Sequence, residues 1–206
     1  MHTKKYITAG KPLNETGKAL ILLHGRGGSA EDILGLADAL PVEDYTLFAL
    51  QATSHSWYPY SFLALPAQNE PWLSSALEVV KELVDEIKAQ GIPEDKIWFT
   101  GFSQGACLML EFITRNAARY GGAAAFTGGL IGDRIYPENY KGDFGGMRVF
   151  IGTSDPDPHV PVQRVLECEG VLKGMVADIL VKVYKGMGHT ITSAEIEEAS
   201  RHVFEG

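Results

Sequence analysis

The sequence predicts an α/β fold in which a mostly parallel central sheet of about seven strands is covered by helices on both faces. Short apolar runs alternate with stretches of helical periodicity, as in wound α/β sheets. The run Ala19–Leu23 is apolar at every position, which is typical of a central parallel strand that is buried on both faces. No internal repeat, linker or low-complexity tract divides the chain, so we expect a single domain over residues 1–206.

Strands are expected at apolar runs that are bounded by glycine, proline or polar turn residues. An edge strand is expected near Lys5–Ala9, followed by strands at Ala19–Leu23, Thr46–Leu50, Lys96–Thr100, Gly122–Phe126, Arg148–Thr153 and Asp178–Tyr184.

Helices are expected between these strands. A helix ending near Gly91 is predicted by one apolar stripe at helical spacing, formed by Leu73, Leu77, Val80, Val84 and Ile87. Further helices are expected at Ala30–Leu40, Gln104–Asn116, Val162–Leu172 and Ser193–Phe204. Two long irregular segments remain, Thr53–Pro71 and Gly128–Gly146, and such loops beside strand ends are where these folds place their sites.

Composition excludes several classes of partner. The formal net charge of −8, from 18 basic and 26 acidic residues, repels nucleic acid and anionic membrane surfaces. No stretch approaches the ~18 apolar residues of a membrane span, and the first residues lack the apolar core of a secretory signal. We therefore expect no nucleic-acid partner, no integral membrane segment and a cytoplasmic location. The two cysteines form no Cys-x-x-Cys pair, and neither a metal nor another cofactor is expected.

A serine between two glycines, Gly101-Phe-Ser103-Gln-Gly105, follows a predicted strand and precedes a predicted helix. This pattern is typical of a nucleophile elbow, in which a tight turn pushes the serine hydroxyl clear of the sheet. A chance match that only marks a turn is the alternative, because the chain contains 23 glycines.

Acyl transfer also needs a base and an acid that orients it. Asp155 and Asp157 follow one later strand and His189 follows the next, so serine, aspartate and histidine occur in the order used by α/β hydrolases. Either aspartate could orient the histidine, since Asp155 lies nearer the strand end and could instead cap its own turn.

The histidines differ in their expected roles. His189 lies between glycines and a helix start, so the base and a helix cap are its two interpretations. His24 is expected to brace the turn that it opens through hydrogen bonds. His55 and His159 lie near the site loops, where pocket and surface positions are both open. His2 is expected to be solvated.

The segment His24-Gly-Arg-Gly-Gly28 has two interpretations. Its glycine spacing fits a dinucleotide fingerprint weakly, because the next strand ends at Gln51 without a carboxylate for a ribose. An oxyanion loop, in which a backbone N–H of this segment joins that of Gln104, uses the same glycines and also accounts for the elbow.

An aromatic segment, Ser56–Leu65, lacks both strand alternation and helical spacing. Trp57, Tyr58, Phe62 and Leu65 are candidates for the apolar wall of an acyl pocket. The alternative is a loop that packs on the core.

These motifs together resemble the phospholipase/carboxylesterase family of α/β hydrolases, which includes the acyl-protein thioesterases. The resemblance implies the α/β-hydrolase fold, Ser103 as nucleophile, Asp157 as acid and His189 as base. It also implies an oxyanion hole made by the backbone N–H groups of Arg26 and Gln104. The motifs that carry it are Leu23-His-Gly25, Ser56-Trp57, Gln90-Gly-Ile-Pro93, the elbow, Asp155-x-Asp-Pro-x-Val-Pro161 and Gly186-Met-x-His189.

Two departures concern substrate choice. Eukaryotic protein thioesterases of this family usually have an apolar residue where Arg26 stands and an acidic residue where Pro59 stands. These departures favour the smaller bacterial-type esterases of the family. We expect a cofactor-independent serine hydrolase acting on small-molecule esters of short to medium acyl chains. Acyl thioesterase or lysophospholipase activity is the rival within enzymes, and a ligand receptor on a hydrolase scaffold is the rival outside them. A homodimer is left open.

Overall fold

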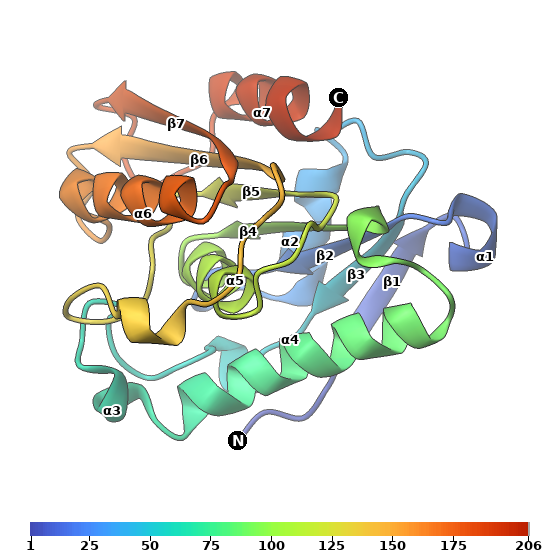
Figure 1. The fold of residues 1–206 in the computed structure, drawn as a ribbon, viewed down its shortest axis with the longest axis horizontal. Coiled ribbons are helices and arrows are strands. Elements are labelled where there is room, and N and C mark those ends of the chain that lie inside the picture. The colour runs from blue at the N-terminus through green and yellow to red at the C-terminus, as the bar shows by residue number, and fades with distance from the viewer. Residues whose placement is uncertain (206) are drawn as a thin grey trace.

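A seven-stranded sheet lies at the centre of the protein in the computed structural model, which describes residues 1–205 (Figure 1). The last residue of the expected domain, Gly206, lies outside the described residues. The strands are β1 (Tyr6–Gly10), β2 (Ala19–Leu23), β3 (Thr46–Leu50), β4 (Ile97–Phe102), β5 (Gly122–Phe126), β6 (Arg148–Asp155) and β7 (Asp178–Lys185). Their order is β1-β3-β2-β4-β5-β6-β7, and β1 alone among them is antiparallel to its neighbour. The predicted fold class is confirmed.

Helices cover both faces of the sheet. They are α1 (Leu13–Thr16), α2 (Ala30–Ala37), α3 (Pro66–Asn69), α4 (Trp72–Ala89), α5 (Gln104–Arg115), α6 (Val162–Gly174) and α7 (Ser193–Ala199), the last continuing as a π-type turn over Ser200–Phe204. Helices α4, α5 and α6 pack on one face with Ile21 and Leu23 of β2, whereas α2 and α7 pack on the other with Leu20 and Leu22. This two-sided burial is why β2 is apolar at every position.

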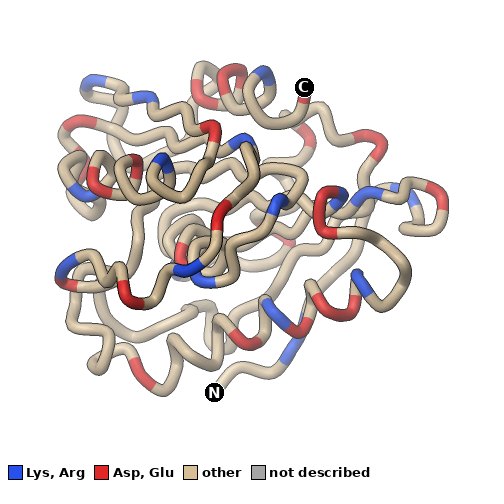
Figure 2. The backbone as a smooth tube through the Cα atoms, in the orientation of Figure 1, with Lys and Arg blue, Asp and Glu red and all other residues tan. Residues whose placement is uncertain are grey.

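Local sequence sets the starts of the two helices on the α2 and α7 face. The hydroxyls of Ser29 and Thr192 each accept a hydrogen bond from the backbone of the third helical residue, whose carboxylate binds back to the cap. These capping boxes satisfy backbone donors that would otherwise lack partners. Figure 2 shows acidic and basic residues interspersed along α4, where Lys81 and Asp85 pair at 2.6 Å. Within residues 1–205 no helix is both long enough and apolar enough to cross a membrane.

The prediction that His2 is solvated is wrong. Its side chain is buried, its Nδ1 accepts a hydrogen bond from the N–H of Thr53 at 3.1 Å, and its Nε2 lies 2.8 Å from the carbonyl oxygen of Trp57. Burial lowers the pKa of His2. The N-terminal segment therefore packs behind the aromatic segment, a contact between residues 55 positions apart that no local pattern indicates.

A steric constraint fixes the turn between β4 and α5. Ser103 has a φ of 53° and a ψ of −117°, a conformation that is strained for a residue with a side chain. A Cβ on Gly101 would lie 2.8 Å from the carbonyl carbon of Gly105, and a Cβ on Gly105 would lie 2.2 Å from the carbonyl oxygen of Leu23 in β2. Both glycines are thus needed for the helix to start against the sheet, as the elbow pattern predicts.

We expect Gly105→Ala to lower the free energy of unfolding by about 3 kcal/mol, the upper end of the usual cost of overpacking, because the added methyl meets backbone that cannot move aside. Gly170→Ala is the matched control. Gly170 lies within α6 with open space around it, so the change should raise stability by about 0.5 to 1 kcal/mol. Urea unfolding measures both, and a Gly105→Ala protein as stable as the wild type would contradict the close approach.

Candidate active site

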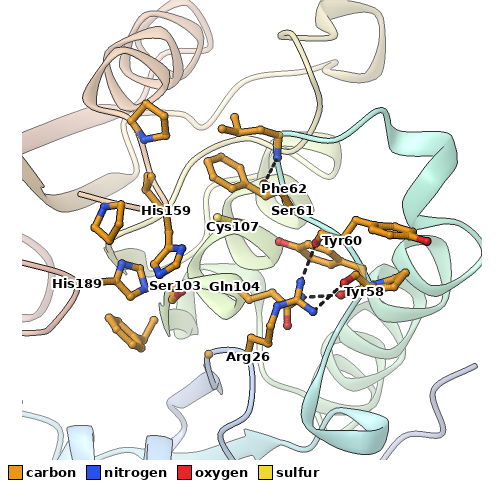
Figure 3. Close-up of a pocket in the computed structure, with 17 residues that line it drawn as sticks. Arg26, Tyr58, Tyr60, Ser61, Phe62, Ser103, Gln104, Cys107, His159 and His189 are labelled. Atoms are coloured by element: carbon orange, nitrogen blue, oxygen red, sulfur yellow. Dashed lines mark hydrogen bonds between the residues drawn. The ribbon is translucent and has the colours of Figure 1, made fainter. Parts of the chain in front are cut away.

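The candidate site lies at the carboxyl ends of three parallel strands. Ser103 follows β4, Asp157 follows β6 and His189 follows β7. Because these ends meet at one edge of the sheet, side chains far apart in sequence converge there. Figure 3 shows Ser103 and His189 facing each other at the wall of a cavity.

Ser103, His189 and Asp157 form one continuous chain of hydrogen bonds. The Oγ of Ser103 lies 2.8 Å from Nε2 of His189, and Nδ1 of His189 lies 2.8 Å from Oδ2 of Asp157. With its proton on Nδ1, the ring donates an N–H to the carboxylate, and Nε2 is then free to accept the serine hydroxyl proton. The arrangement can remove a proton from the hydroxyl and hold the resulting imidazolium beside a negative charge.

Both oxygens of the Asp157 carboxylate accept hydrogen bonds. Its side chain is buried, and its Oδ1 accepts the backbone N–H groups of His159 at 2.7 Å and Val160 at 2.8 Å. Burial raises the pKa of Asp157, but the bonds from His189 and the two N–H groups outweigh it, so the net pKa lies below its usual value. The carboxylate is therefore charged at neutral pH.

Asp155, the other candidate, is placed differently. It is exposed, and its backbone carbonyl accepts the N–H of Gly186 at 2.9 Å. The aspartate that contacts His189 is thus Asp157, whose position two residues further along turns its side chain inward.

Ser154, which sequence reasoning missed, joins the aspartate and histidine loops. Its buried Oγ accepts the N–H of Gly188 at 2.9 Å and donates to the carbonyl of Pro156 at 3.2 Å. Together with the bond between Gly186 and Asp155, this contact holds the turns after β6 and β7 against each other. A serine at a strand end was the only signal in the sequence, and its partner lies 34 residues away.

His24 braces the glycine loop, defined as His24–Gly28, as predicted. Its Nε2 accepts the N–H of Ala52 at 3.1 Å, and its Nδ1 lies 2.7 Å from the carbonyl of Gly25. Burial lowers the pKa of His24, which keeps the ring neutral. His55 supports the same loop, because its carbonyl accepts the N–H of Gly27 at 2.7 Å and its Nδ1 lies 2.8 Å from the carbonyl of Gly28.

Two backbone N–H groups border Ser103. A Cβ on Gly25 would lie 3.5 Å from Cβ of Ser103, so the glycine loop runs directly beside the elbow. Arg26 and Gln104 both line the cavity, and among residues 1–205 their N–H groups have no protein acceptor. Gln104 is also the first residue of α5, where the helix dipole favours negative charge.

The side chains of Gln104 and Arg26 hold the aromatic segment Ser56–Leu65. The Gln104 amide accepts the N–H of Trp57 at 3.0 Å and donates to the carbonyl of Tyr58 at 2.8 Å. The Arg26 guanidinium donates to the hydroxyl of Ser56. It also donates to the carbonyls of the two residues that follow Tyr58 (Figure 3). Gln104 of the elbow and Arg26 of the glycine loop therefore both hold the aromatic segment in place.

A cavity of about 700 Å³ opens beside Ser103 and His189. Tyr58 and Phe62 line it, but Trp57 and Leu65 do not, which corrects the expectation that all four form its wall. The Trp57 ring is fully buried, and its Nε1 donates to the carbonyl of His24 at 2.9 Å. Leu65 precedes α3 with 51% of its surface exposed.

Sequence reasoning also missed part of the lining. His159, whose position was left open, lines the cavity, and its ring stands edge-on to that of His189 at 4.8 Å between centroids. Cys107 lines the floor one helical turn after Ser103, a spacing of four residues that could have identified it. Within residues 1–205 no three His, Cys, Asp or Glu side chains are grouped as metal ligands.

A model of the phospholipase/carboxylesterase family matches residues 6–204. The chain belongs to this family. A phospholipase/carboxylesterase structure from Dyadobacter fermentans is 52% identical, with a TM-score of 0.98 over 99% of this chain and 98% of that one. The predicted resemblance and α/β-hydrolase fold are thereby confirmed.

Curated relatives are more distant. Acyl-protein thioesterase 1 from Eremothecium gossypii is 28% identical over 70% of this chain and 60% of its own length. A probable carboxylesterase from Oryza sativa is 27% identical over 70% of this chain and 56% of its own length. The chain thus spans less than two thirds of the length of these curated relatives. The family and these relatives are ester and thioester hydrolases.

We expect Gln104→Ala to lower the free energy of unfolding by about 1 to 3 kcal/mol, because it leaves the N–H of Trp57 buried without a partner. The carbonyl of Tyr58 loses the Gln104 amide and keeps only the Ser56 hydroxyl as a donor. Gln68→Ala is the control, since that exposed side chain lies on the short helix α3. Thermal and urea unfolding compare the two. Equal losses would contradict the role of the Gln104 amide in holding the aromatic segment.

Proposed function

We propose that this protein is a serine carboxylesterase that hydrolyses short- to medium-chain carboxylic esters through an acyl-enzyme. The observation that supports this proposal most directly is the hydrogen-bonded chain from Asp157 through His189 to Ser103. The serine stands on a strained elbow that faces a cavity. This arrangement supports nucleophilic catalysis, in which a covalent intermediate replaces one difficult step by two easier ones.

In the first proposed step, Nε2 of His189 takes the proton of Ser103 while Oγ attacks the ester carbonyl carbon. The carbonyl oxygen becomes an oxyanion. The backbone N–H groups of Arg26 and Gln104 are the proposed donors to it, and losing one such donor typically costs about 2.7 to 4 kcal/mol of transition-state stabilisation. Asp157 stabilises the imidazolium without itself taking the proton.

In the proposed second half, the C–O bond to the leaving alcohol breaks and His189 returns its proton to that oxygen. Water then attacks the acyl group, gives one proton to Nε2 and releases the carboxylic acid as Ser103 recovers its hydrogen. No cofactor takes part in these steps, because each bond change is a proton transfer or an addition at one carbonyl carbon.

The cavity supports an acyl group of limited length as the substrate. Phe62, Leu63 and Val160 give it apolar walls, and each methylene that such walls accept adds about 0.8 kcal/mol of binding. Arg26 carries charge at the mouth, which supports small-molecule esters over long-acyl proteins.

A thioesterase shares the same acyl-enzyme step, and the similarity to the Eremothecium gossypii acyl-protein thioesterase favours it as the second candidate. Matched oxygen and sulfur esters with one acyl group separate the two by their kcat/KM ratio. Lysophospholipase activity is tested with a lysophosphatidylcholine. Failure to turn over an aryl acetate would favour the ligand receptor instead.

Ser103→Ala should lower kcat for 4-nitrophenyl acetate by a factor on the order of 10⁶, since it deletes the nucleophile. The fold should persist, because both glycines of the elbow remain. Circular dichroism checks folding, and a fluorophosphonate should label Ser103 in the wild type only. A folded variant with wild-type turnover would sink the proposal.

Asp157→Asn should lower kcat by up to about 10⁴, because an amide favours the wrong imidazole tautomer and removes a negative charge beside the imidazolium. Asp155→Asn is the matched control and should change kcat little, since that side chain is exposed. Steady-state kinetics on both variants decide the matter. A large loss confined to Asp155→Asn would overturn the assignment of the acid.

A further inference from the structure

One buried polar group at the cavity has only a weak partner among residues 1–205, because the Tyr58 hydroxyl lies beside the Cys107 thiol without the geometry of an ordinary hydrogen bond. Among the described residues, five buried side-chain atoms lack a hydrogen bond, namely Tyr58 Oη, Trp98 Nε1, Thr127 Oγ1, Thr153 Oγ1 and Glu195 Oε1. Of these residues, Tyr58 is the one that lines the cavity beside Ser103. A buried hydroxyl without a strong hydrogen-bond partner lowers the stability of the folded protein. The protein keeps this hydroxyl at the point where substrate would lie, and such a group calls for an explanation.

The Tyr58 ring is held in place from behind. Its residue is 1% exposed, and its backbone carbonyl accepts a hydrogen bond from the Gln104 amide. Figure 3 shows the hydroxyl directed toward Cys107, which lies on α5 one turn beyond Ser103. Tyr58, Cys107 and Ser103 line the same cavity, so the hydroxyl lies at its floor.

The surroundings leave this hydroxyl free to donate. Burial raises the pKa of Tyr58 well above its usual value, so the proton stays on the oxygen. Burial also raises the pKa of Cys107 to about 12, and this neutral thiol already accepts the N–H of Gly129 at 3.4 Å. The Cys107 thiol beside the Tyr58 hydroxyl is a weak hydrogen-bond partner, which an oxygen acceptor would replace.

We propose that the Tyr58 hydroxyl donates a hydrogen bond to an oxygen on the acyl chain of the substrate, so that the enzyme prefers esters of oxygen-substituted acids to esters of plain alkyl acids. This inference rests on the proposed esterase function and names its substrate class. A substrate oxygen completes the hydrogen bonding of a site that an alkyl chain leaves unpaired, and such sites discriminate against the analogue that lacks the polar atom.

Helix geometry gives the position of that oxygen. Ser103 and Cys107 are four residues apart, roughly 6 Å along the axis of α5. An extended chain advances about 1.2 Å per bond, so an atom about five bonds from Oγ of Ser103 reaches the level of Cys107. A 4-alkoxybutanoyl group places its ether oxygen at this distance.

The test compares two esters of equal size, 4-nitrophenyl 4-methoxybutanoate and 4-nitrophenyl hexanoate, which differ by one oxygen in place of a methylene. The kcat/KM ratio of the ether ester to the alkyl ester should fall about five- to tenfold in Tyr58→Phe. Tyr45→Phe is the matched control, because that buried tyrosine packs on the opposite face of the sheet, and its ratio should equal that of the wild type.

The wild type alone provides a second measurement if Tyr58→Phe does not fold. Its ratio for the two esters should exceed the ratio of their hydroxide-catalysed hydrolysis rates, which accounts for their intrinsic reactivity. A wild-type ratio no greater than the hydroxide ratio overturns the inference. So does a Tyr58→Phe protein with an unchanged ratio, which would show that water or Cys107 occupies the hydroxyl.

Failure of this inference is distinguishable from failure of the proposed function. Turnover of 4-nitrophenyl acetate and fluorophosphonate labelling of Ser103 test the function without involving Tyr58. If both succeed while the ester ratio does not respond to Tyr58→Phe, the esterase stands and the preference for oxygen-substituted acyl groups is wrong.

Discussion

The close approach of β2 to the start of α5 constrains the whole site. A side chain at Gly105 would overlap the carbonyl oxygen of Leu23, so the helix meets the strand only through glycine. This contact brings together the serine after β4, the glycine loop after β2 and the first N–H of α5. The proposed oxyanion donors, Arg26 and Gln104, are thus neighbours because of core packing, which holds them rigidly.

Other contacts extend this rigidity to both sides of the serine. On one side, Ser154 joins the turns that carry Asp157 and His189, so the acid and base keep their separation. On the other, the side chain of Gln104 holds the aromatic segment whose ring lines the cavity. Residues of the proposed catalytic turns therefore also shape the substrate pocket, and a change at one of them would affect both binding and chemistry.

Local patterns predicted the elements well where burial is uniform. The bounds of β2, β3 and β5 agree with their apolar runs, because a strand buried on both faces admits few polar residues. The helix expected over Ser193–Phe204 ends its regular turns at Ala199, and the rest follows a π-type turn. Within the aromatic segment, composition predicted a pocket wall but could not separate Tyr58, which lines the cavity, from Trp57, which packs into the core.

The sequence by itself determined the sheet, the elbow and the order of serine, aspartate and histidine, since these depend on steric and hydrophobic rules that act over a few neighbouring residues. Only the tertiary structure decided why His2 is buried and why the Tyr58 hydroxyl has no better neighbour than a thiol. It also places Asp157, the acid that the resemblance implies, against His189. Each of these depends on groups far apart in the chain, such as Asp157 and His189, which are 32 positions apart. Hydrogen-bond partners at that separation are set by how strands and loops pack, which no local pattern encodes.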